Sequence, residues 1–358
     1  MDRDFGASSL YLAVMAGGSG TRFWPKSTSK KPKQLLSFEA TSENGASSLL
    51  ARTLSRFKSL VPKTQQMILT TQKLENAVRA EAPGVEVLAE PQGRNTAPCI
   101  YWAARKIAEK NPKGVMLVMP SDHWIAHPER FVETVKLAAA RAAHHDELVA
   151  LGVQPSRPET GYGYLKAGER VDEEGCRRVE AFVEKPGIEK AREFLRSGNY
   201  LWNGGMCLWR AETILRAFDT FMPELKKAWE TARGEVEAAY PKMTATSIDY
   251  GIMEKAQNVV SFPLDCGWDD LGSWVSLEGL ADRLGAKHAA GVVSAGECLA
   301  IDSEGNIVDA PGKLVALLGA KDLIIVEQGN ALLIARKDRA QDIRLVVEEV
   351  KKKKPELA

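Results

Sequence analysis

The chain has 358 residues, of which 44% are hydrophobic, and its 48 basic and 47 acidic side chains leave a formal net charge of +1. This length suffices for one large α/β domain with a small appendage, and the hydrophobic fraction permits a substantial core. The balanced charge excludes a strongly basic or acidic overall surface, so we expect neither nucleic acid nor a membrane among the partners.

Two further features indicate a cytoplasmic protein. The five cysteines lie far apart and form no C-x-x-C pair, which is typical of reduced thiols. The N-terminal MDRDFGASSL lacks the basic start and long apolar stretch of a signal peptide, and no apolar run approaches the roughly 20 residues that span a bilayer.

The first two-thirds of the chain predicts alternating strands and helices. The apolar run Leu10–Met15 ends at Gly17-Gly18 and indicates a buried strand. Further strands are expected at Gln66–Thr70, Val115–Met119, Leu148–Val153, Arg178–Glu184 and Gly204–Trp209, and helices at Ser47–Phe57, Asn95–Lys110, Pro128–His144, Ile188–Leu195, Ala211–Phe221 and Ser273–Leu284. This alternation predicts a Rossmann-like α/β fold, with a mixed, mostly parallel sheet flanked by helices.

After about Lys287 the pattern changes to short apolar segments separated by turn signals. The segments are Gly291–Val293, Leu299–Ile301, Leu314–Leu318, Leu323–Val326 and Ala331–Ile334, and a helix is expected from about Arg339 to Lys352. We therefore predict a large α/β domain over residues 1–285 and a small β-rich, β-helix-like C-terminal domain over 286–358.

The glycine-rich segment AGGSGTR (residues 16–22) follows the first predicted strand. It is neither a Walker loop nor the G-x-G-x-x-G fingerprint. Its glycines let backbone N–H groups approach an anion, and Arg22 adds a bidentate phosphate donor. Lys33 can reach the same space if the chain folds back. The segment therefore predicts a phosphate-binding loop.

The extended segment GGSGTRFWPKSTSKKPKQ resembles the signature of the sugar-phosphate nucleotidyltransferases, specifically the short bacterial mannose-1-phosphate guanylyltransferases. The resemblance continues in order through QGRNTAP (92–98), PSDH (120–123), GYGY (161–164), FVEKP (182–186), WNGGM (202–206) and GWDDLGSW (267–274). It spans nearly the whole chain, and several motifs in order are more specific than any one of them.

The resemblance implies that GTP and mannose 1-phosphate react to give GDP-mannose and diphosphate by in-line attack of the sugar phosphate on the α-phosphorus. Because both substrates are anions, the protein must mainly neutralise charge and align them. We expect Arg22, Lys33 and Lys185 to act in catalysis. The nucleotide site would comprise Ala16, Gly17, Gly18, Ser19, Gly20, Thr21, Arg22, Lys33, Arg94, Asn95, Thr96 and Asp122, and the sugar-phosphate site Gly163, Glu184, Lys185 and Asn203.

A divalent cation, Mg²⁺ or another, is the implied cofactor. Asp122 follows the predicted strand Val115–Met119, and ligands collect at such strand ends. The resemblance assigns Asp122 and Asp270 as metal ligands. Asp269 beside Asp270 leaves the register of the second ligand open. Asp270 is favoured because it stands two residues before Gly272, and Asp269 is the alternative.

Two alternatives remain open: a nucleotidyltransferase for another NTP and sugar 1-phosphate, and a non-catalytic regulator that binds a sugar nucleotide. The resemblance also implies a homodimer in which the C-terminal element supports association. Because the chain ends before the fused isomerase domain of long bifunctional members, we expect no second activity.

Overall fold

The computed structural model describes residues 9–18, 20–38, 47–282 and 284–358. Its contacts divide the chain into two compact units, which are described separately. Unit 1 comprises residues 1–17, 55–121 and 125–268, and unit 2 comprises residues 18–54, 122–124 and 269–358. The sequence-based boundary at residue 285 remains a prediction. No helix in the described ranges is both long and apolar enough to cross a bilayer.

Unit 1 is built on a nine-stranded mixed sheet in the order β3-β2-β1-β4-β9-β6-β10-β8-β7. Its strands are β1 (Leu10–Met15), β2 (Gln66–Thr71), β3 (Glu86–Glu90), β4 (Val115–Pro120), β6 (Leu148–Val153), β7 (Tyr164–Arg170), β8 (Arg177–Val183), β9 (Tyr200–Arg210) and β10 (Val259–Leu264). Parallel ladders join β3, β2, β1 and β4 and also β6 and β10, and β9 runs antiparallel to β4 and β6. The carboxyl ends of β1, β2 and β3 therefore lie at one edge of the sheet.

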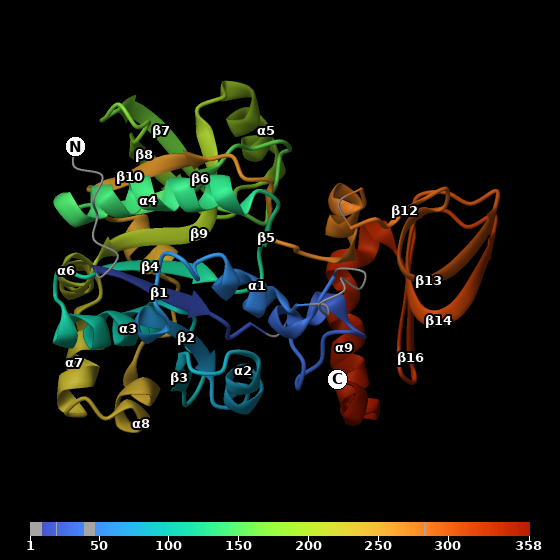
Figure 1. The fold of residues 1–358 in the computed structure, drawn as a ribbon, viewed down its shortest axis with the longest axis horizontal. Coiled ribbons are helices and arrows are strands. Elements are labelled where there is room, and N and C mark those ends of the chain that lie inside the picture. Colours follow the sequence, from blue (N-terminus) through green and yellow to red (C-terminus); the bar gives the residue numbers. More distant parts are fainter. Residues whose placement is uncertain (1–8, 19, 39–46, 283) are drawn as a thin grey trace. The chain divides into compact units, whose positions relative to one another are not determined.

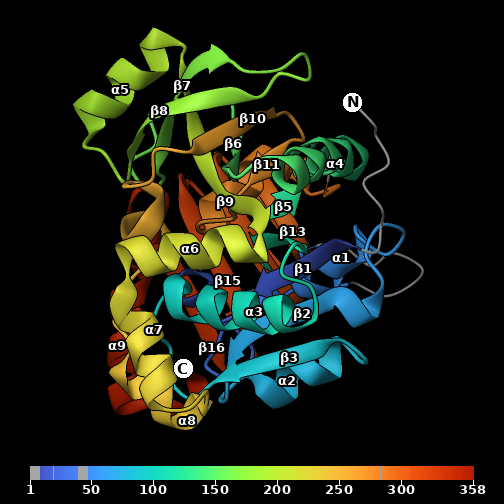
Figure 2. The same ribbon diagram turned by 90° about the vertical axis from the view of Figure 1, so that its left-hand side faces the viewer.

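Helices pack on this sheet because its strands are apolar on both faces. β1 is the run LYLAVM, in which five successive residues are buried. Tyr11 and Ala13 belong to a core cluster with residues of α3 (Thr96–Lys110) and α6 (Ala211–Phe221), and Figure 2 shows these two helices side by side. The other described helices of unit 1 are α2 (Glu75–Glu81), α4 (Pro128–His144), α5 (Ile188–Ser197), α7 (Pro223–Thr231) and α8 (Val236–Ala239), with the 3₁₀ turns Lys63–Gln65 and Tyr240–Lys242 and the π-helix Asp249–Met253.

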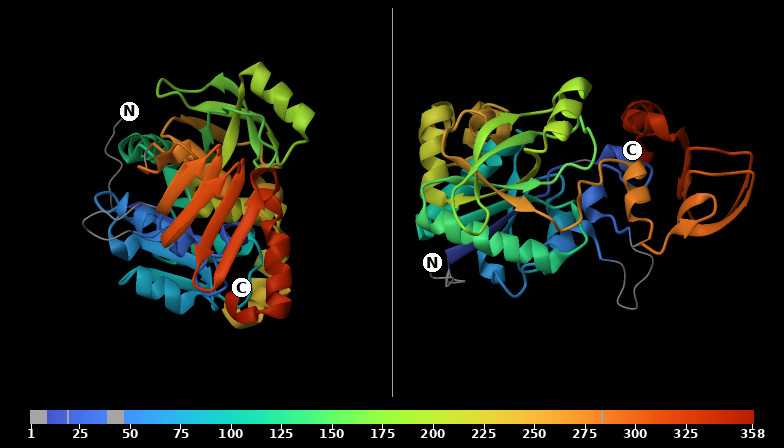
Figure 3. Two further views of the ribbon diagram at one scale, coloured as in Figure 1. Left: turned by 90° about the vertical axis from the view of Figure 1, so that its right-hand side faces the viewer. Right: turned by 90° about the horizontal axis from the view of Figure 1, so that it is seen from above.

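Unit 2 carries a five-stranded sheet in the order β12-β13-β14-β15-β16 (Figure 3). The strands are β12 (Lys287–His288), β13 (Gly291–Ile301), β14 (Asn306–Leu318), β15 (Leu323–Gln328) and β16 (Ala331–Arg336). β13, β14 and β15 pair in parallel around a small core of Ala290, Val308, Leu317 and Ile325. The described helices of this unit are α1 (Leu49–Ser55) and α9 (Ile343–Lys353), with 3₁₀ segments at Thr21–Phe23, Lys33–Leu35, Trp274–Leu280, Lys337–Asp342 and Pro355–Leu357. Two short strands, β5 (Trp124–Ile125) and β11 (Trp268–Asp269), lie at unit boundaries.

The mixed α/β class with a C-terminal β domain and a terminal helix is confirmed (Figure 1). Four predicted elements match to the residue: Leu10–Met15, Pro128–His144, Leu148–Val153 and Ala211–Phe221. The α-helix expected over 273–284 was wrong, since this stretch is a 3₁₀ segment over Trp274–Leu280. The apolar segments at 291–293 and 299–301 are one strand, because β13 bends at register shifts between Val293 and Glu297 instead of ending there.

Candidate active site

In unit 2, the glycine-rich segment approaches Lys33 closely at Gly20. Gly20 has φ +57, and a Cβ there would stand 2.2 Å from Cβ of Lys33. Glycine is therefore the residue that fits both the left-handed backbone and the space. The 3₁₀ turn Thr21–Phe23 follows, and Phe23 packs on Phe38 and Trp274 with ring centroids 5.0 and 5.2 Å away. The predicted return of Lys33 to the glycine segment thus occurs in the structure.

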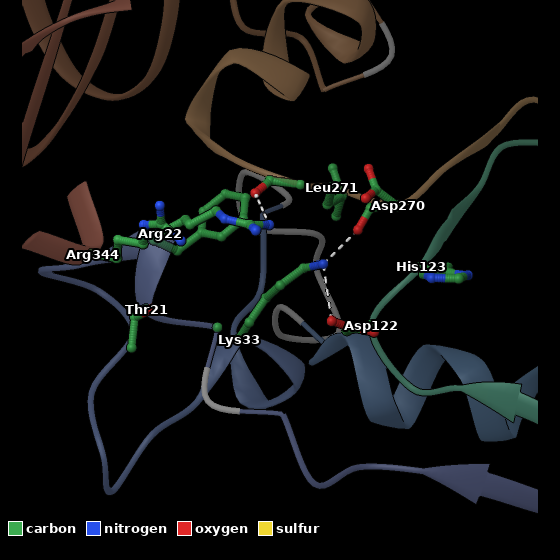
Figure 4. Close-up of a pocket in the computed structure, with 11 residues that line it drawn as sticks. Thr21, Arg22, Lys33, Asp122, His123, Asp270, Leu271 and Arg344 are labelled. Carbon is green, nitrogen blue, oxygen red and sulfur yellow. Dashed lines mark hydrogen bonds and ion pairs between the residues drawn. The ribbon is translucent and has the colours of Figure 1, made fainter. Parts of the chain in front are cut away.

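A cavity of about 360 Å³ opens beside this turn, and Figure 4 shows its side chains. Lys33 Nζ lies 3.0 Å from Oδ2 of Asp122 and donates to the backbone carbonyl of Asp270. Arg22 donates to the carbonyl of Gly272 at 3.3 Å. We call this space the Lys33 cavity. Its described lining residues are Gly20, Thr21, Arg22, Phe23, Lys33, Asp122, His123, Asp270, Leu271, Gly272 and Arg344.

The charge of Asp122 is set by its neighbours. Burial alone would raise the pKa of this carboxyl, but the Lys33 ammonium, with a smaller contribution from His123, holds it below its ordinary value. Asp122 is therefore an anion at neutral pH. Its side chain keeps 30% of its exposure, whereas that of Lys33 keeps only 8%.

The two adjacent aspartates of the 267–274 motif have different surroundings. Oδ1 of Asp269 accepts from the backbone N–H of Leu271 at 2.7 Å, which fixes that carboxylate in a local turn. Asp270 lines the Lys33 cavity, and Asp269 does not. Of the two aspartates, Asp270 is therefore the one that lines the Lys33 cavity.

A second polar cluster lies in unit 1, at Gly163, Glu184, Lys185, Asn203 and Asp249, and we call it the Glu184 cluster. A Cβ at Gly163 would stand 2.4 Å from Oε2 of Glu184, and the Gly163 carbonyl accepts from the Asn203 N–H at 2.8 Å. Lys185, at φ +48, pairs with Glu184 at 2.5 Å. Burial alone would lower the pKa of Lys185, but the Glu184 carboxylate raises it. The four predicted sugar-site residues are therefore neighbours in the structure.

Asp249 is the member of this cluster that the sequence reasoning missed. Its Oδ1 accepts from the Asn203 side-chain amide at 2.9 Å. Burial and the nearby Glu184 raise its pKa to about 6. A signal was present, because an aspartate between the buried Ile248 and Ile252 is unusual on an apolar helical face. It begins a π-helical turn, and such turns are frequent at functional sites.

Three residues of the predicted nucleotide site, Arg94, Asn95 and Thr96, make side-chain hydrogen bonds to backbone within unit 1. Arg94 donates to the carbonyls of Met243 and Pro241 at 3.0 and 2.9 Å. The Asn95 side chain caps α3 by accepting from the Thr96 N–H, and Thr96 Oγ1 accepts from the Ile248 N–H, both at 2.9 Å. These side chains thus hold backbone groups of α3 and of residues 241–248 in unit 1.

The remaining predicted nucleotide residues are divided between the units. Ala16 and Gly17 belong to unit 1, where the Ala16 N–H donates to the Leu69 carbonyl at 2.7 Å. Gly18, Gly20 and Thr21 belong to unit 2, and Ser19 lies outside the described residues.

Comparison with known proteins identifies the family. The nucleotidyl transferase family matches residues 12–286. The chain belongs to this family. The MannoseP isomerase/GMP-like beta-helix domain matches residues 296–350.

Several relatives cover almost the whole of this nucleotidyltransferase. The mannose-1-phosphate guanylyltransferase ManC of Salmonella typhimurium is 36% identical over 96% of this chain and 74% of the relative. The mannose-1-phosphate guanylyltransferase of Salmonella montevideo is 34% identical over 94% of this chain and 73% of the relative. A crystal structure from Thermus thermophilus, named a mannose-1-phosphate geranyltransferase, is 35% identical, with a TM-score of 0.86 over 96% of this chain and 99% of that chain.

The residues of the Lys33 cavity fit a divalent cation of the kind that nucleotidyltransferases typically use. Mg²⁺ is usually held by one or two carboxylates together with substrate phosphates and water. The cavity offers two aspartates, and Asp122 is kept anionic by Lys33. The described residues contain no group of three or more His, Cys, Asp or Glu side chains placed to hold a metal by themselves. A pair of carboxylates is thus suited to a cation that arrives with a nucleotide.

Proposed function

We propose that this nucleotidyltransferase transfers a guanylyl group from GTP to α-D-mannose 1-phosphate and releases diphosphate. Relatives named mannose-1-phosphate guanylyltransferase, 34% and 36% identical over 94% and 96% of the chain, support the choice of substrates. The observation that carries the proposal is the Lys33 cavity, where a buried ammonium pairs with the Asp122 carboxylate beside a glycine-rich turn and a second aspartate, Asp270, lines the same space. This is the charge arrangement that a metal-bound triphosphate requires.

In this proposal the cations of unit 2 bind the triphosphate. Lys33 and Arg22 neutralise its oxygens and stabilise the diphosphate as it leaves. Gly20 lets Lys33 lie directly against the turn. Asp122 and Asp270 would hold Mg²⁺, which supplies further positive charge to the phosphate oxygens.

The Glu184 cluster binds the sugar phosphate in the same proposal. Lys185, whose side chain is 58% exposed, is available to pair with the phosphate. Glu184 and Asn203 accept from and donate to sugar hydroxyls, and Gly163 lets the sugar approach the backbone. A sugar-phosphate oxygen then attacks the α-phosphorus in line, so no side chain has to act as the nucleophile.

The test is the release of diphosphate from each pair in a panel of NTPs and sugar 1-phosphates. We expect GTP with mannose 1-phosphate to have the highest kcat/KM, and chelation of divalent cations to abolish turnover. A preference for another pair would replace the proposed substrates and leave the reaction class unchanged. If the chain bound GDP-mannose but showed no turnover in the presence of Mg²⁺, it would instead be a non-catalytic regulator that binds a sugar nucleotide.

We also propose a cytoplasmic homodimer that associates through the C-terminal sheet. Leu299, Ile301, Leu314 and Leu318 are 51%, 53%, 61% and 78% exposed. In the β13–β14 ladder Ile301 lies opposite Leu318, and Leu314 and Leu318 point to the same side. An apolar face of this kind marks an association surface. Sedimentation should give a dimer for the native chain and a monomer for Leu318→Lys, and a native monomer would refute this proposal.

A further inference from the structure

Arg344 is a cation of the Lys33 cavity to which the proposed mechanism gives no role. It belongs to α9 and lines the cavity together with Arg22 and Lys33, and Figure 4 shows it among the lining side chains. It lies in the stretch 296–350 that matches the beta-helix domain, far along the chain from the glycine-rich segment. The C-terminal part of the chain therefore reaches the cavity that is proposed to bind the triphosphate.

The guanidinium of Arg344 is available to a ligand. The residue is exposed and has no hydrogen-bond or ion-pair partner among the residues that the structure describes. Other cations of the same C-terminal segment are paired locally, Arg339 with Asp342 and Lys352 with Glu349. Arginine presents a planar fork of N–H donors that matches phosphate oxygens. An arginine that lines a cavity without a protein partner is therefore suited to a phosphate ligand.

The formal charges of the cavity show what Arg344 adds. Lys33 offsets the carboxylate of Asp122, with which it pairs, and Arg22 offsets the second aspartate of the lining. With His123 neutral, Arg344 therefore gives the lining its net positive charge. Without Arg344, only a bound metal ion would add net positive charge to oppose the phosphates of a nucleotide.

The helix that carries Arg344 is fixed against the glycine-rich segment. α9 packs on the 3₁₀ turn Thr21–Phe23, and Ile343, the residue before Arg344, is buried. Beyond the helix, the indole N–H of Trp24 donates to the backbone carbonyl of Leu357 at 2.8 Å. The backbone of Arg344 is therefore positioned by the same segment that forms the glycine-rich turn.

The position of Arg344 on its helix also favours a bound anion. It is the second residue of α9, and the first turn of this helix holds no acidic side chain. The N-terminal end of a helix carries partial positive charge, so a cation in the first turn is unfavourable by itself. Asp342, which precedes the helix, already pairs with Arg339. A phosphate group beside Arg344 would offset both positive charges.

We infer that Arg344 binds the β- and γ-phosphates of the nucleotide, which leave as diphosphate, and that the C-terminal segment thereby completes the triphosphate site. The inference rests on the proposed function and adds a binding residue to it. Arg344 shares its cavity with Lys33 and Arg22, which are proposed to hold the triphosphate. The sugar phosphate is assigned to Lys185 in unit 1. Residues 286–358 then serve substrate binding as well as the proposed association.

The experiment compares the native chain with Arg344→Met, which removes the charge and keeps much of the side-chain length. Arg344→Met should raise KM for GTP and the Kd of diphosphate, measured by calorimetry with Mg²⁺, about tenfold or more, because a charge-assisted contact is lost. KM for mannose 1-phosphate and Kd for GDP-mannose should stay within about threefold of the native values, since neither ligand contains the leaving phosphates.

Two further variants sharpen the comparison. Arg344→Lys keeps the charge but loses the fork, so its constants should lie between those of the native chain and of Arg344→Met. Lys351→Met, at an exposed position of the same helix outside the cavity lining, is the matched control and should behave as the native chain.

The outcomes separate this inference from the proposed function. If the native chain does not prefer GTP with mannose 1-phosphate in the substrate panel, the proposed substrates fail, and the binding of diphosphate still tests Arg344. If the native chain binds no diphosphate, or Arg344→Met binds diphosphate within about threefold of the native Kd, the inference is wrong. An equal weakening of GDP-mannose and diphosphate would also overturn it, because it would indicate a structural role. Arg344→Gln, a second neutral variant, is judged by the same limits should thermal melting show that Arg344→Met does not fold.

Discussion

Replacing Lys33 with methionine removes the ammonium and keeps most of the side-chain volume. In the structure Nζ lies 3.0 Å from Oδ2 of Asp122 and donates to the Asp270 carbonyl. At an effective dielectric constant of about 20, two unit charges at this distance attract by roughly 5 to 6 kcal/mol before desolvation is subtracted. Because 30% of the Asp122 side chain remains exposed to water, the variant should lose only about 1 to 3 kcal/mol of unfolding free energy.

The effect on turnover should be larger than the effect on stability. Lys33 is proposed to stabilise charge on the triphosphate as diphosphate leaves, and loss of one such preorganised donor lowers kcat by about 10²- to 10³-fold, or roughly 3 to 4 kcal/mol. Diphosphate release measures kcat and KM, and urea denaturation measures the unfolding free energy. Lys30→Met, at an exposed position on the same segment, is the matched control and should change neither quantity. A Lys33→Met enzyme that keeps kcat/KM within threefold of the native value would refute this role of Lys33.

Three further changes test the remaining parts of the two sites. Lys185→Ala should raise KM for mannose 1-phosphate about tenfold or more and leave KM for GTP nearly unchanged, as initial rates would show. Asp270→Asn should lower Mg²⁺-dependent kcat by roughly 10²-fold, whereas Asp269→Asn should mainly cost about 1 kcal/mol of stability; the reverse result would make Asp269 the ligand. The pKa of Asp249 is raised to about 6, so the native state holds its proton between pH 4 and 6 while the unfolded chain has lost it, and stability falls as pH rises through that window. Asp249→Asn should reduce this loss of stability by about 1 to 3 kcal/mol, which thermal melting at pH 4.5 and 7 would measure. An unchanged dependence of stability on pH would contradict the raised pKa of Asp249.

The elements that could be predicted from the sequence are those whose cause is local. β1 is a continuous apolar run that ends at paired glycines. α4 begins at Pro128, and because proline is favoured in the first turn of a helix, this N-terminus could be predicted. By contrast, β3 was missed because its apolar character is short and follows a helix without clear caps. The 3₁₀ segment Trp274–Leu280 has helical spacing in the sequence, and that spacing does not distinguish a 3₁₀ segment from an α-helix.

The candidate site shows the same division between local and tertiary causes. The resemblance placed Gly163, Glu184, Lys185 and Asn203 in one group, and in the structure these residues are neighbours. It could not reveal that Arg94 is used to hold the carbonyls at 241 and 243, since those contacts join segments about 150 residues apart. Asp249 carries no motif of its own, and its place between Ile248 and Ile252 was its only signal, because its hydrogen bond to Asn203 forms only in the folded chain.

The glycine-rich signature has a physical reason for its form that phosphate binding alone does not supply. Gly20 must be glycine because its Cβ would overlap Cβ of Lys33 and because its φ is +57. The same contact seats Lys33 against Asp122, and that ion pair keeps the aspartate anionic. A larger residue at position 20 would therefore displace the lysine and, through it, raise the pKa of the carboxylate. The glycine, the lysine and the aspartate act as one unit, and for this reason the glycine-rich signature has to occur together with the PSDH motif (120–123), far from it in the sequence.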